Sequence, residues 1–234
     1  MPDPGFQLLY ESGPCLAVCK PAGVLTQAPP GIDSLEVRIT EYLKQREGKT
    51  GNIYLGIPHR LDRPASGAML FARHVRAARR LAEQFEGRLV DKTYWACVVG
   101  HPDPAEGELR DFLRKIPEQP RAEVVPETHP EGRQAILRYR TLGSFDWGAW
   151  LEVDLFTGRT HQVRVQLASR GHPLLGDAFY GCDRPFGEPF ADVRLRAIAL
   201  HCRRLAFAHP MAREPVAVEA PLTTAWEALG LGVS

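Results

Sequence analysis

The chain of 234 residues is 44% hydrophobic and 24% charged, a composition that excludes a disordered segment. Its formal net charge of +1 neither requires nor excludes a polyanionic partner, because such binding depends on how charge is distributed over the surface. No apolar run approaches the ~20 residues needed to cross a bilayer, which excludes a membrane-spanning chain and predicts a soluble protein.

The five cysteines are odd in number, and no apolar signal sequence precedes the first of them, Cys15. Cys15 and Cys19 form one close pair, but no second close pair completes a structural zinc site. We therefore expect buried, unpaired thiols and a cytoplasmic location.

The N-terminal part predicts a hairpin of two short strands, over 6–11 and 15–19, around the turn Ser12-Gly13-Pro14. Asp33 and Glu36 have the spacing of a capping arrangement for a helix that ends near Gly48. Gly48-Lys49-Thr50 resembles the end of a phosphate-binding loop, but Leu43 stands where that motif needs a glycine. Nucleotide hydrolysis is rejected on that ground.

A polar segment, Pro58 to Gly67, follows between two predicted strands over 53–55 and 68–72. Its prolines and glycine favour a rigid loop over a helix, and loops held by strands commonly carry catalytic groups. It contains an imidazole, two guanidiniums and one carboxylate, that of Asp62. A surface salt-bridge turn is the alternative for such a string when it stands alone. We place the chemistry at Asp62.

The next predicted elements are a helix over 75–85, stopped by Gly87, and a strand over 92–99 rich in aromatic and β-branched residues. Arg73, Arg76 and Arg80 share a helix face away from the apolar stripe. That face is either a phosphate-contacting surface or a solvated helix side, and the sequence leaves both open.

The second half begins with a proline-rich connection over 101–130, where strand signals are weak. Strands are expected over 134–142, 150–155, 198–207 and 216–219. Thr160 is expected to cap a helix through Leu167 that places His161 and Arg164 on one face, and Thr223 a last short helix. With no repeat and no linker, residues 1–234 are expected to form a single α+β domain.

Four segments together resemble the motifs of pseudouridine synthases of the RluA type, in the same order and with similar spacing. They are Lys20-Pro21-Ala22-Gly23, His59-Arg60-Leu61-Asp62 with Ser66-Gly67, Lys92-Thr93-Tyr94, and Gly158-Arg159-Thr160-His161-Gln162-Val163-Arg164. Gly171-His172-Pro173 and Gly176-Asp177 continue the pattern, so the resemblance covers nearly the whole chain. It implies a mixed, mainly antiparallel sheet with flanking helices and a central RNA-binding cleft.

The family isomerises uridine within RNA to pseudouridine by breaking the glycosidic C–N bond and rejoining the base through carbon. The resemblance implies that Asp62 is the essential carboxylate, Tyr94 stacks on the target base, and Arg164 positions Asp62. Arg60 resembles the arginine that enters the space of the flipped base, and Leu200 resembles a residue that lines the base pocket. His59 is expected to shape the loop. No metal or other cofactor is implied.

Three positions depart from the family pattern: Pro64 and Ala65 where a polar residue and threonine are common, and Gln166 where histidine is frequent. We expect effects on positioning and RNA choice rather than on the reaction class. Because the catalytic signals begin by about Phe6, we expect no separate N-terminal RNA-binding module. The expected partner is a stem-loop in transfer or ribosomal RNA, and the expected state is a monomer.

Three other functions remain as alternatives. His59, Asp62 and His161 form a two-histidine, one-carboxylate set that a metal ion could use. A glycoside hydrolase could pair Asp62 with Asp154 or Asp177. A non-catalytic RNA-binding protein could use the same fold, although such a protein has little need for an anionic side chain where a polyanion binds.

Overall fold

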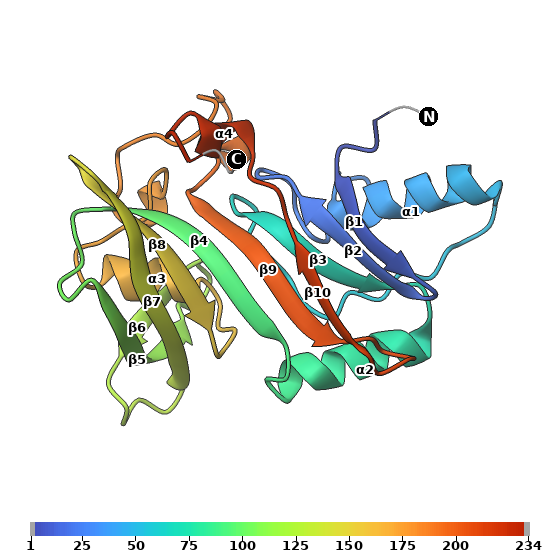
Figure 1. Ribbon diagram of the computed structural model, residues 1–234, viewed down its shortest axis with the longest axis horizontal. Coiled ribbons are helices and arrows are strands. Elements are labelled where there is room, and N and C mark those ends of the chain that lie inside the picture. The colour runs from blue at the N-terminus through green and yellow to red at the C-terminus, as the bar shows by residue number, and fades with distance from the viewer. Residues whose placement is uncertain (1–2, 232–234) are drawn as a thin grey trace.

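A mixed sheet of ten strands runs through residues 3–231, the part of the chain that this computed structural model describes (Figure 1). The strands are β1 (Gln7–Ser12), β2 (Cys15–Lys20), β3 (Ser66–Ala72), β4 (Asp91–Val99), β5 (Glu106–Lys115), β6 (Ala122–Val125), β7 (Arg133–Phe145), β8 (Gly148–Leu155), β9 (Leu200–Ala208) and β10 (Pro215–Glu219). Their order is β1-β2-β3-β9-β4-β8-β7-β5-β6, and β10 pairs with β9. Most neighbours are antiparallel, which confirms the expected fold class.

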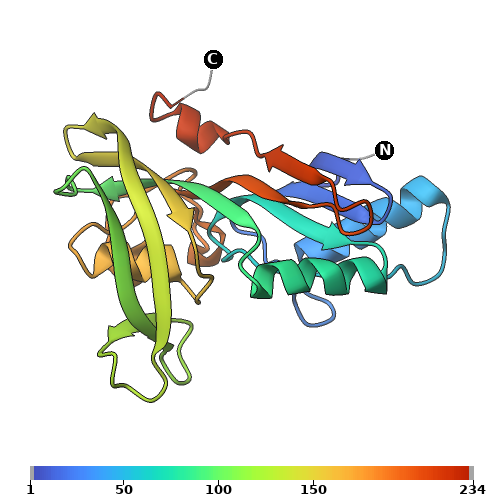
Figure 2. The same cartoon turned by 60° about the horizontal axis from the view of Figure 1, so that its bottom comes forward.

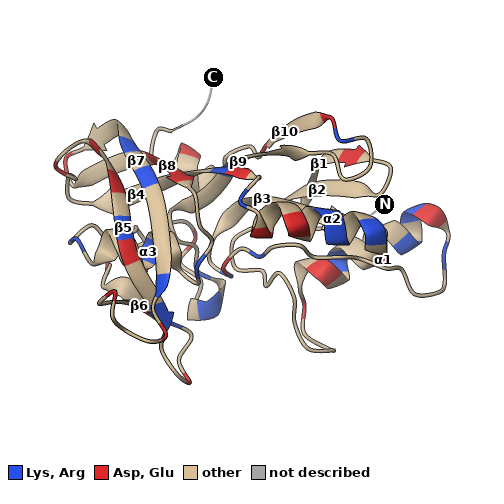
Figure 3. Ribbon diagram, turned by 90° about the horizontal axis from the view of Figure 1, so that it is seen from below, with Lys and Arg blue, Asp and Glu red and all other residues tan. Residues whose placement is uncertain are grey.

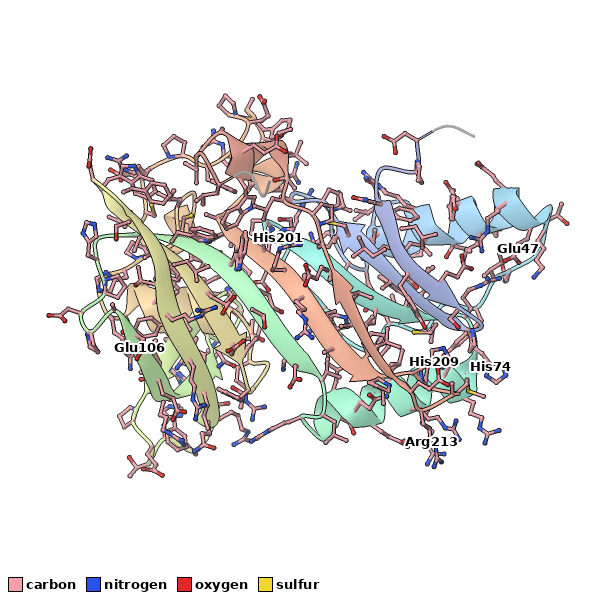
Figure 4. All side chains as sticks on the ribbon, in the orientation of Figure 1. Glu47, His74, Glu106, His201, His209 and Arg213 are labelled. Carbon is pink, nitrogen blue, oxygen red and sulfur yellow. The ribbon has the colours of Figure 1, made fainter. Side chains whose placement is uncertain are left out.

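The two halves of the sheet meet where β3 runs parallel to β9. Ser66 Oγ lies 2.8 Å from Nδ1 of the buried His201, which Figure 4 labels near the centre of the molecule. The next residue, Gly67, has φ +117, and a Cβ at this position would overlap the backbone of Cys202. Only glycine therefore allows β3 to approach β9 so closely.

Gly67→Ala is expected to lower the free energy of unfolding by about 2–4 kcal/mol, because backbone strain adds to an overlap that only a shift of β9 relieves. Urea denaturation followed by circular dichroism measures the change. Gly51→Ala is the matched control, since a Cβ at Gly51 meets nothing within 4 Å. Equal stabilities for the two variants would contradict the close approach as the reason for glycine.

Four α-helices accompany the sheet: α1 (Leu35–Glu47), α2 (Val75–Glu86), α3 (Gln162–Ala168) and α4 (Thr224–Glu227). The start of α1 corrects the expected cap by one residue: Ser34 accepts from the Val37 N–H, while Asp33 forms an ion pair with Arg38. Gly48 ends α1 in the left-handed conformation, as expected. Figure 2 shows α2 and α3 beneath the sheet, with α4 above it. Among the described residues, no helix is long and apolar enough to span a bilayer.

One predicted strand is absent, and the connection with weak strand signals contains two strands. Residues 53–55 form no strand; only Gly56 makes an isolated bridge, to Ala72. The proline-rich connection over 101–130 contains two paired strands, β5 and β6. Charged side chains of the two strands form ion pairs such as that of Arg114 with Glu123. The charged residues of these strands hide the alternation by which a strand is recognised in a sequence.

The third helix also begins later than expected. Its N-cap is His161 rather than Thr160, with φ 53 and ψ 26, and it runs from Gln162 to Ala168. His161 therefore occupies the left-handed region, which residues other than glycine seldom adopt. Six consecutive residues of α3, Gln162 to Leu167, are buried, so this short helix is held by packing against the sheet.

Candidate active site

A cavity of about 950 Å³ opens where the two halves of the sheet meet. Its walls come from the loop 57–65, the C-terminal ends of α2 and β8, the N-terminal parts of β4 and β9, and the segment 156–164 leading into α3. Asp62 lies on this wall with 28% of its side chain exposed. The four motifs found in the sequence thus meet in or beside one space.

The loop that carries Asp62 is held by hydrogen bonds to residues on both sides of it. The Thr26 hydroxyl donates to the Leu61 carbonyl over 3.0 Å, and the N–H of Gly23 donates to the Arg63 carbonyl over 2.8 Å. The Ile198 N–H donates to the Pro64 carbonyl over 3.1 Å. The backbone at Asp62 is therefore fixed before any substrate binds.

Lys20 supports the same loop from inside the protein. Its ammonium is fully buried and donates to the carbonyls of Pro21, Val24 and Arg63 over 2.8–3.1 Å. Burial lowers the pKa of Lys20 to about 7, while the Asp62 carboxylate opposes this shift. The charged form supplies all three donors, so it matches the three carbonyls that surround it.

Arg164 joins two carboxylates that are distant in the sequence. Its Nη1 donates to Asp62 Oδ2 over 3.2 Å, and its Nε and Nη2 donate to the two oxygens of Asp177 over 2.7 and 2.8 Å. Arg164 and Asp177 are 2% and 1% exposed, so the second carboxylate fixes the guanidinium from behind. Asp62 faces the cavity and remains accessible to a substrate.

Tyr94 and Leu200 form an apolar part of the cavity wall next to Asp62. The ladder between β4 and β9 shifts register between Thr93 and Tyr94, and such irregularities redirect side chains at active sites. Burial, with Cys202 beside it, raises the pKa of Tyr94 well above its usual value, so the ring is neutral. Arg60 lines the same cavity and is exposed.

His59 has a structural environment. Its Nε2 accepts the Leu70 N–H over 2.9 Å, and its ring stacks on Phe85 with centroids 4.3 Å apart. Burial, with Lys92 nearby, lowers the pKa of His59 to about 3. The imidazole is therefore neutral and already bonded, in keeping with its expected part in shaping the loop.

The three arginines proposed for one helix face lie outside the cavity, and Arg73 is not on the helix, because it precedes the N-cap of α2, His74. Arg73 forms ion pairs with Glu11 and Glu47, and Arg80 donates to the Pro210 carbonyl. Arg76 is exposed and lies about 13 Å along the helix from Phe85, the nearer cavity residue, at a rise of about 1.5 Å per residue. Figure 4 places Glu47 at the far end of α1, and Figure 3 shows the basic residues of α2 on its half nearer α1.

A second group of basic side chains lies at the cavity itself. Five cationic residues line it, Arg60, Arg88, Lys92, Arg159 and Arg164, against two acidic residues, Asp62 and Glu86. Arg159 donates to the Gln134 carbonyl beside Arg133, and burial together with Arg88 and Arg133 lowers the pKa of Arg159. No ion pair to Arg88, Arg133 or Arg159 is present within residues 3–231. Arg159 stands in a sequence motif that gives it no separate role, and no motif indicates Arg88 or Arg133.

The three departures from the family pattern all lie in buried or bonded positions. Ala65 is 1% exposed, and the Pro64 carbonyl accepts the bond from Ile198. Gln166 is buried and donates to Asp111 over 2.7 Å, while its Oε1 has no partner among the described residues. Ala65 nevertheless lines the cavity, whereas Pro64 and Gln166 do not.

The geometry does not favour the alternative enzymes. His59 uses Nε2 for the Leu70 N–H, and no cluster of three metal-binding side chains occurs in the described part of the chain. For a glycosidase, Asp177 is bound through both oxygens by Arg164, and Asp154 is exposed and bonded to Thr93. Neither carboxylate is therefore placed to flank one glycosidic bond together with Asp62, as a glycosidase requires.

Comparison with known proteins agrees with this geometry. The family described as RNA pseudouridylate synthase matches residues 14–169. An uncharacterised RNA pseudouridine synthase of Synechocystis is 32% identical over 227 residues, covering 96% of this chain and 68% of the relative. The ribosomal large subunit pseudouridine synthase D of Xanthomonas campestris is 33% identical over 227 residues, covering 94% and 67%.

A solved structure described as human RNA pseudouridylate synthase domain containing 4 has the same fold. It superposes with a TM-score of 0.76 at 22% identity, and the match covers 96% of this chain and 93% of the human chain. The family match extends over more than half of the chain, and the expected resemblance is confirmed. The chain belongs to the RluA-type RNA pseudouridine synthases, isomerases that convert uridine in RNA to pseudouridine.

Proposed function

We propose that Asp62 is the essential carboxylate of this isomerase and that its target is a uridine in a stem-loop of ribosomal or transfer RNA. The observation that carries the proposal is the position of Asp62 at the cavity, bonded to an arginine that a buried carboxylate holds in place. A fixed guanidinium orients the Asp62 carboxylate, the group able to attack the sugar or to remove a sugar proton.

The other cavity residues match the remaining needs of the reaction. The base detaches from C1′ and rejoins through carbon 5, so it must be held while it turns. We assign that task to the neutral ring of Tyr94 and to Leu200 beside it. Arg60 is exposed and lies two residues before Asp62. We propose that its side chain enters the space that the flipped nucleotide leaves, where its contacts offset the free-energy cost of unstacking.

The path of the RNA backbone is proposed to cross Arg88 and Arg159, which line the cavity, and Arg133 near Arg159. Three guanidiniums without carboxylate partners among residues 3–231 attract phosphate groups and release counterions when these bind. Arg73, Arg76 and Arg80 remain a proposed second contact, but two of them are already bonded within the protein. The cavity cluster is therefore expected to contribute more to RNA affinity.

Arg88→Gln and Arg159→Gln are each expected to weaken RNA binding and to reduce the slope of log affinity against log salt by about 1. Fluorescence anisotropy with labelled RNA over a range of salt concentrations measures both quantities. Arg76→Gln is the comparison on α2, and we expect a smaller change. A larger change for Arg76→Gln than for Arg88→Gln would move the RNA path to α2, and an unchanged slope for Arg76→Gln would assign that helix face to solvent.

The RNA class is proposed from the relatives. The Xanthomonas campestris relative is a ribosomal large subunit pseudouridine synthase, so large-subunit ribosomal RNA is the first candidate target and transfer RNA the second. We place the enzyme in the cytoplasm, in keeping with five unpaired buried cysteines. We propose that it acts as a monomer and without a cofactor, since Asp62, Tyr94 and Arg164 of one chain supply the groups that the isomerisation needs.

The proposal is tested by release of tritium from carbon 5 of uridine in unmodified ribosomal and transfer transcripts. The C5–H bond breaks only when the base rejoins through that carbon. Release from ribosomal RNA alone would assign the first target, and release from transfer RNA alone the second. Release of a free base from either RNA would contradict the isomerase assignment for this cavity.

A further inference from the structure

A chain of polar groups leads from Asp62 into the β-hairpin on the far side of the cavity. His161 Nε2 lies 3.8 Å from Asp62 Oδ2, and His161 Nδ1 lies 3.0 Å from the Tyr180 hydroxyl. That hydroxyl lies 3.0 Å from the N–H and 3.2 Å from the carbonyl of Ala122, the first residue of β6. The roles that we assign to Asp62, Tyr94 and Arg164 in the reaction do not involve His161, Tyr180 or Ala122.

The protons shared by these polar groups can be assigned from the donors and acceptors present. The Ala122 N–H is only a donor, so the Tyr180 oxygen accepts from it and its single proton goes either to the Ala122 carbonyl or to His161 Nδ1. Nδ1 is the nearer of the two. When Nδ1 accepts that proton, a neutral imidazole carries its own proton on Nε2, the nitrogen nearest the Asp62 carboxylate.

The opposite tautomer is disfavoured by the carboxylate. It would place the Nε2 lone pair against Asp62 Oδ2, two acceptors without a proton between them. The left-handed conformation of His161, with φ 53, directs the ring between Tyr180 and Asp62, and a backbone strained in this way is found where a site fixes a side chain. The 3.8 Å separation exceeds a hydrogen bond, and such contacts in unliganded enzymes shorten when substrate binds.

We propose that His161 is a positioning residue that presents Nε2–H to Asp62 as a second donor beside Arg164, and that Tyr180, held by Ala122 of β6, sets this tautomer. The inference rests on the proposed role of Asp62. It assigns a function to two residues that the reaction scheme leaves unused. It also links the β5–β6 hairpin, whose neighbouring Pro120 lines the cavity, to the orientation of the catalytic carboxylate.

The charges around His161 come from four parts of the chain. Asp62 faces it from the loop before β3, Arg164 from α3, Asp177 and Tyr180 from the segment Asp177 to Tyr180, and Arg121 from the turn before β6. Burial lowers the pKa of His161, and Asp62 opposes the shift while Arg164 adds to it. The imidazole is neutral near neutral pH, so its tautomer matters.

Tyr180→Phe keeps the ring and removes the hydroxyl that, together with the Asp62 carboxylate, favours this tautomer. We expect the single-turnover rate of tritium release from carbon 5 to fall about tenfold to a hundredfold at about pH 8.5, the effect of one hydrogen bond to a charged group. At a pH below the pKa of His161, which burial holds under its usual 6.5, an imidazolium carries protons on both nitrogens, so Nε2–H is restored and the variant should approach the wild-type rate measured at that pH. A merely structural role would lower the rate equally at both pH values.

His161→Asn is the matched variant, because asparagine tolerates the left-handed conformation but does not titrate. It should lose a similar factor at both pH values, and the double variant should be no slower than the single ones. Tyr139→Phe is the control, since it also removes a buried hydroxyl bonded to a backbone carbonyl, that of Pro104, and should keep the wild-type rate and pH profile.

A Tyr180→Phe deficit that is independent of pH, or His161→Asn with the wild-type rate, would overturn the inference. Both results leave the proposed function intact, because wild-type release and its loss in Asp62→Asn are measured in the same assay. Recovery of Tyr180→Phe at low pH, with no recovery of His161→Asn, supports the tautomer role.

Discussion

Arg164→Met is expected to lower the rate of pseudouridine formation by about a thousandfold or more while RNA affinity stays within about tenfold, because a group that orients the nucleophile or base, the role proposed for Arg164, acts mainly in the transition state. Arg164 is 2% exposed and lies behind Asp62, where it has little surface to offer to RNA. Its Nη1 holds one carboxylate oxygen of Asp62, and without it the aspartate is free to rotate.

The single substitution also leaves the buried Asp177 without its partner, which costs about 3–5 kcal/mol of stability. The double variant Arg164→Met/Asp177→Asn removes that unpaired charge, so it separates loss of folding from loss of orientation. Single-turnover rates and anisotropy on the same RNA measure the two effects, and thermal unfolding confirms the fold. Equal losses of affinity and rate in the double variant would remove Arg164 from the positioning role.

Asp62→Asn is expected to lower the rate by about 10⁴-fold or more, since an amide can neither attack the sugar nor accept its proton. RNA affinity should be unchanged or slightly higher, because the substitution removes a negative charge from a site that binds a polyanion. Stability should change little, because Asp177 still pairs with Arg164 through two hydrogen bonds.

Glu86→Gln is the matched control for Asp62→Asn, because it neutralises the other acidic residue of the cavity. We expect wild-type single-turnover rates for this variant and a similar small gain in affinity. If Glu86→Gln lost as much activity as Asp62→Asn, the assignment of the essential carboxylate to Asp62 would be wrong.

The sequence predicts the cavity well because its motifs are local strings tied to turns and strand ends. The contact of Asp62 with Arg164 spans 102 positions, yet it follows from the resemblance, which relates the two motifs in space. The roles of Asp177 and Tyr180 do not follow in the same way. Their partners lie on other elements, and no periodicity in the sequence indicates which carboxylate will hold a buried guanidinium.

The face of α2 illustrates the limit of helical spacing as a signal. Arg73, Arg76 and Arg80 share a face by their spacing, but long-range packing decides what lies opposite that face. Arg73 forms ion pairs with Glu11 of β1 and Glu47 of α1, and these contacts depend on how the N-terminal hairpin packs. The basic cluster at the cavity comes instead from the turn after α2, the start of β7 and the loop before α3, which no single stretch of sequence brings together.

The role of Asp62 is best tested by single-turnover release of tritium from carbon 5, with enzyme in excess over a ribosomal or transfer transcript, for the wild type and Asp62→Asn. We expect release by the wild type in proportion to the pseudouridine formed, and none above background from Asp62→Asn although it binds the RNA equally well. Release by Asp62→Asn at a rate close to the wild type would contradict the central role of Asp62. RNA binding without release by either protein would instead favour a non-catalytic RNA-binding role.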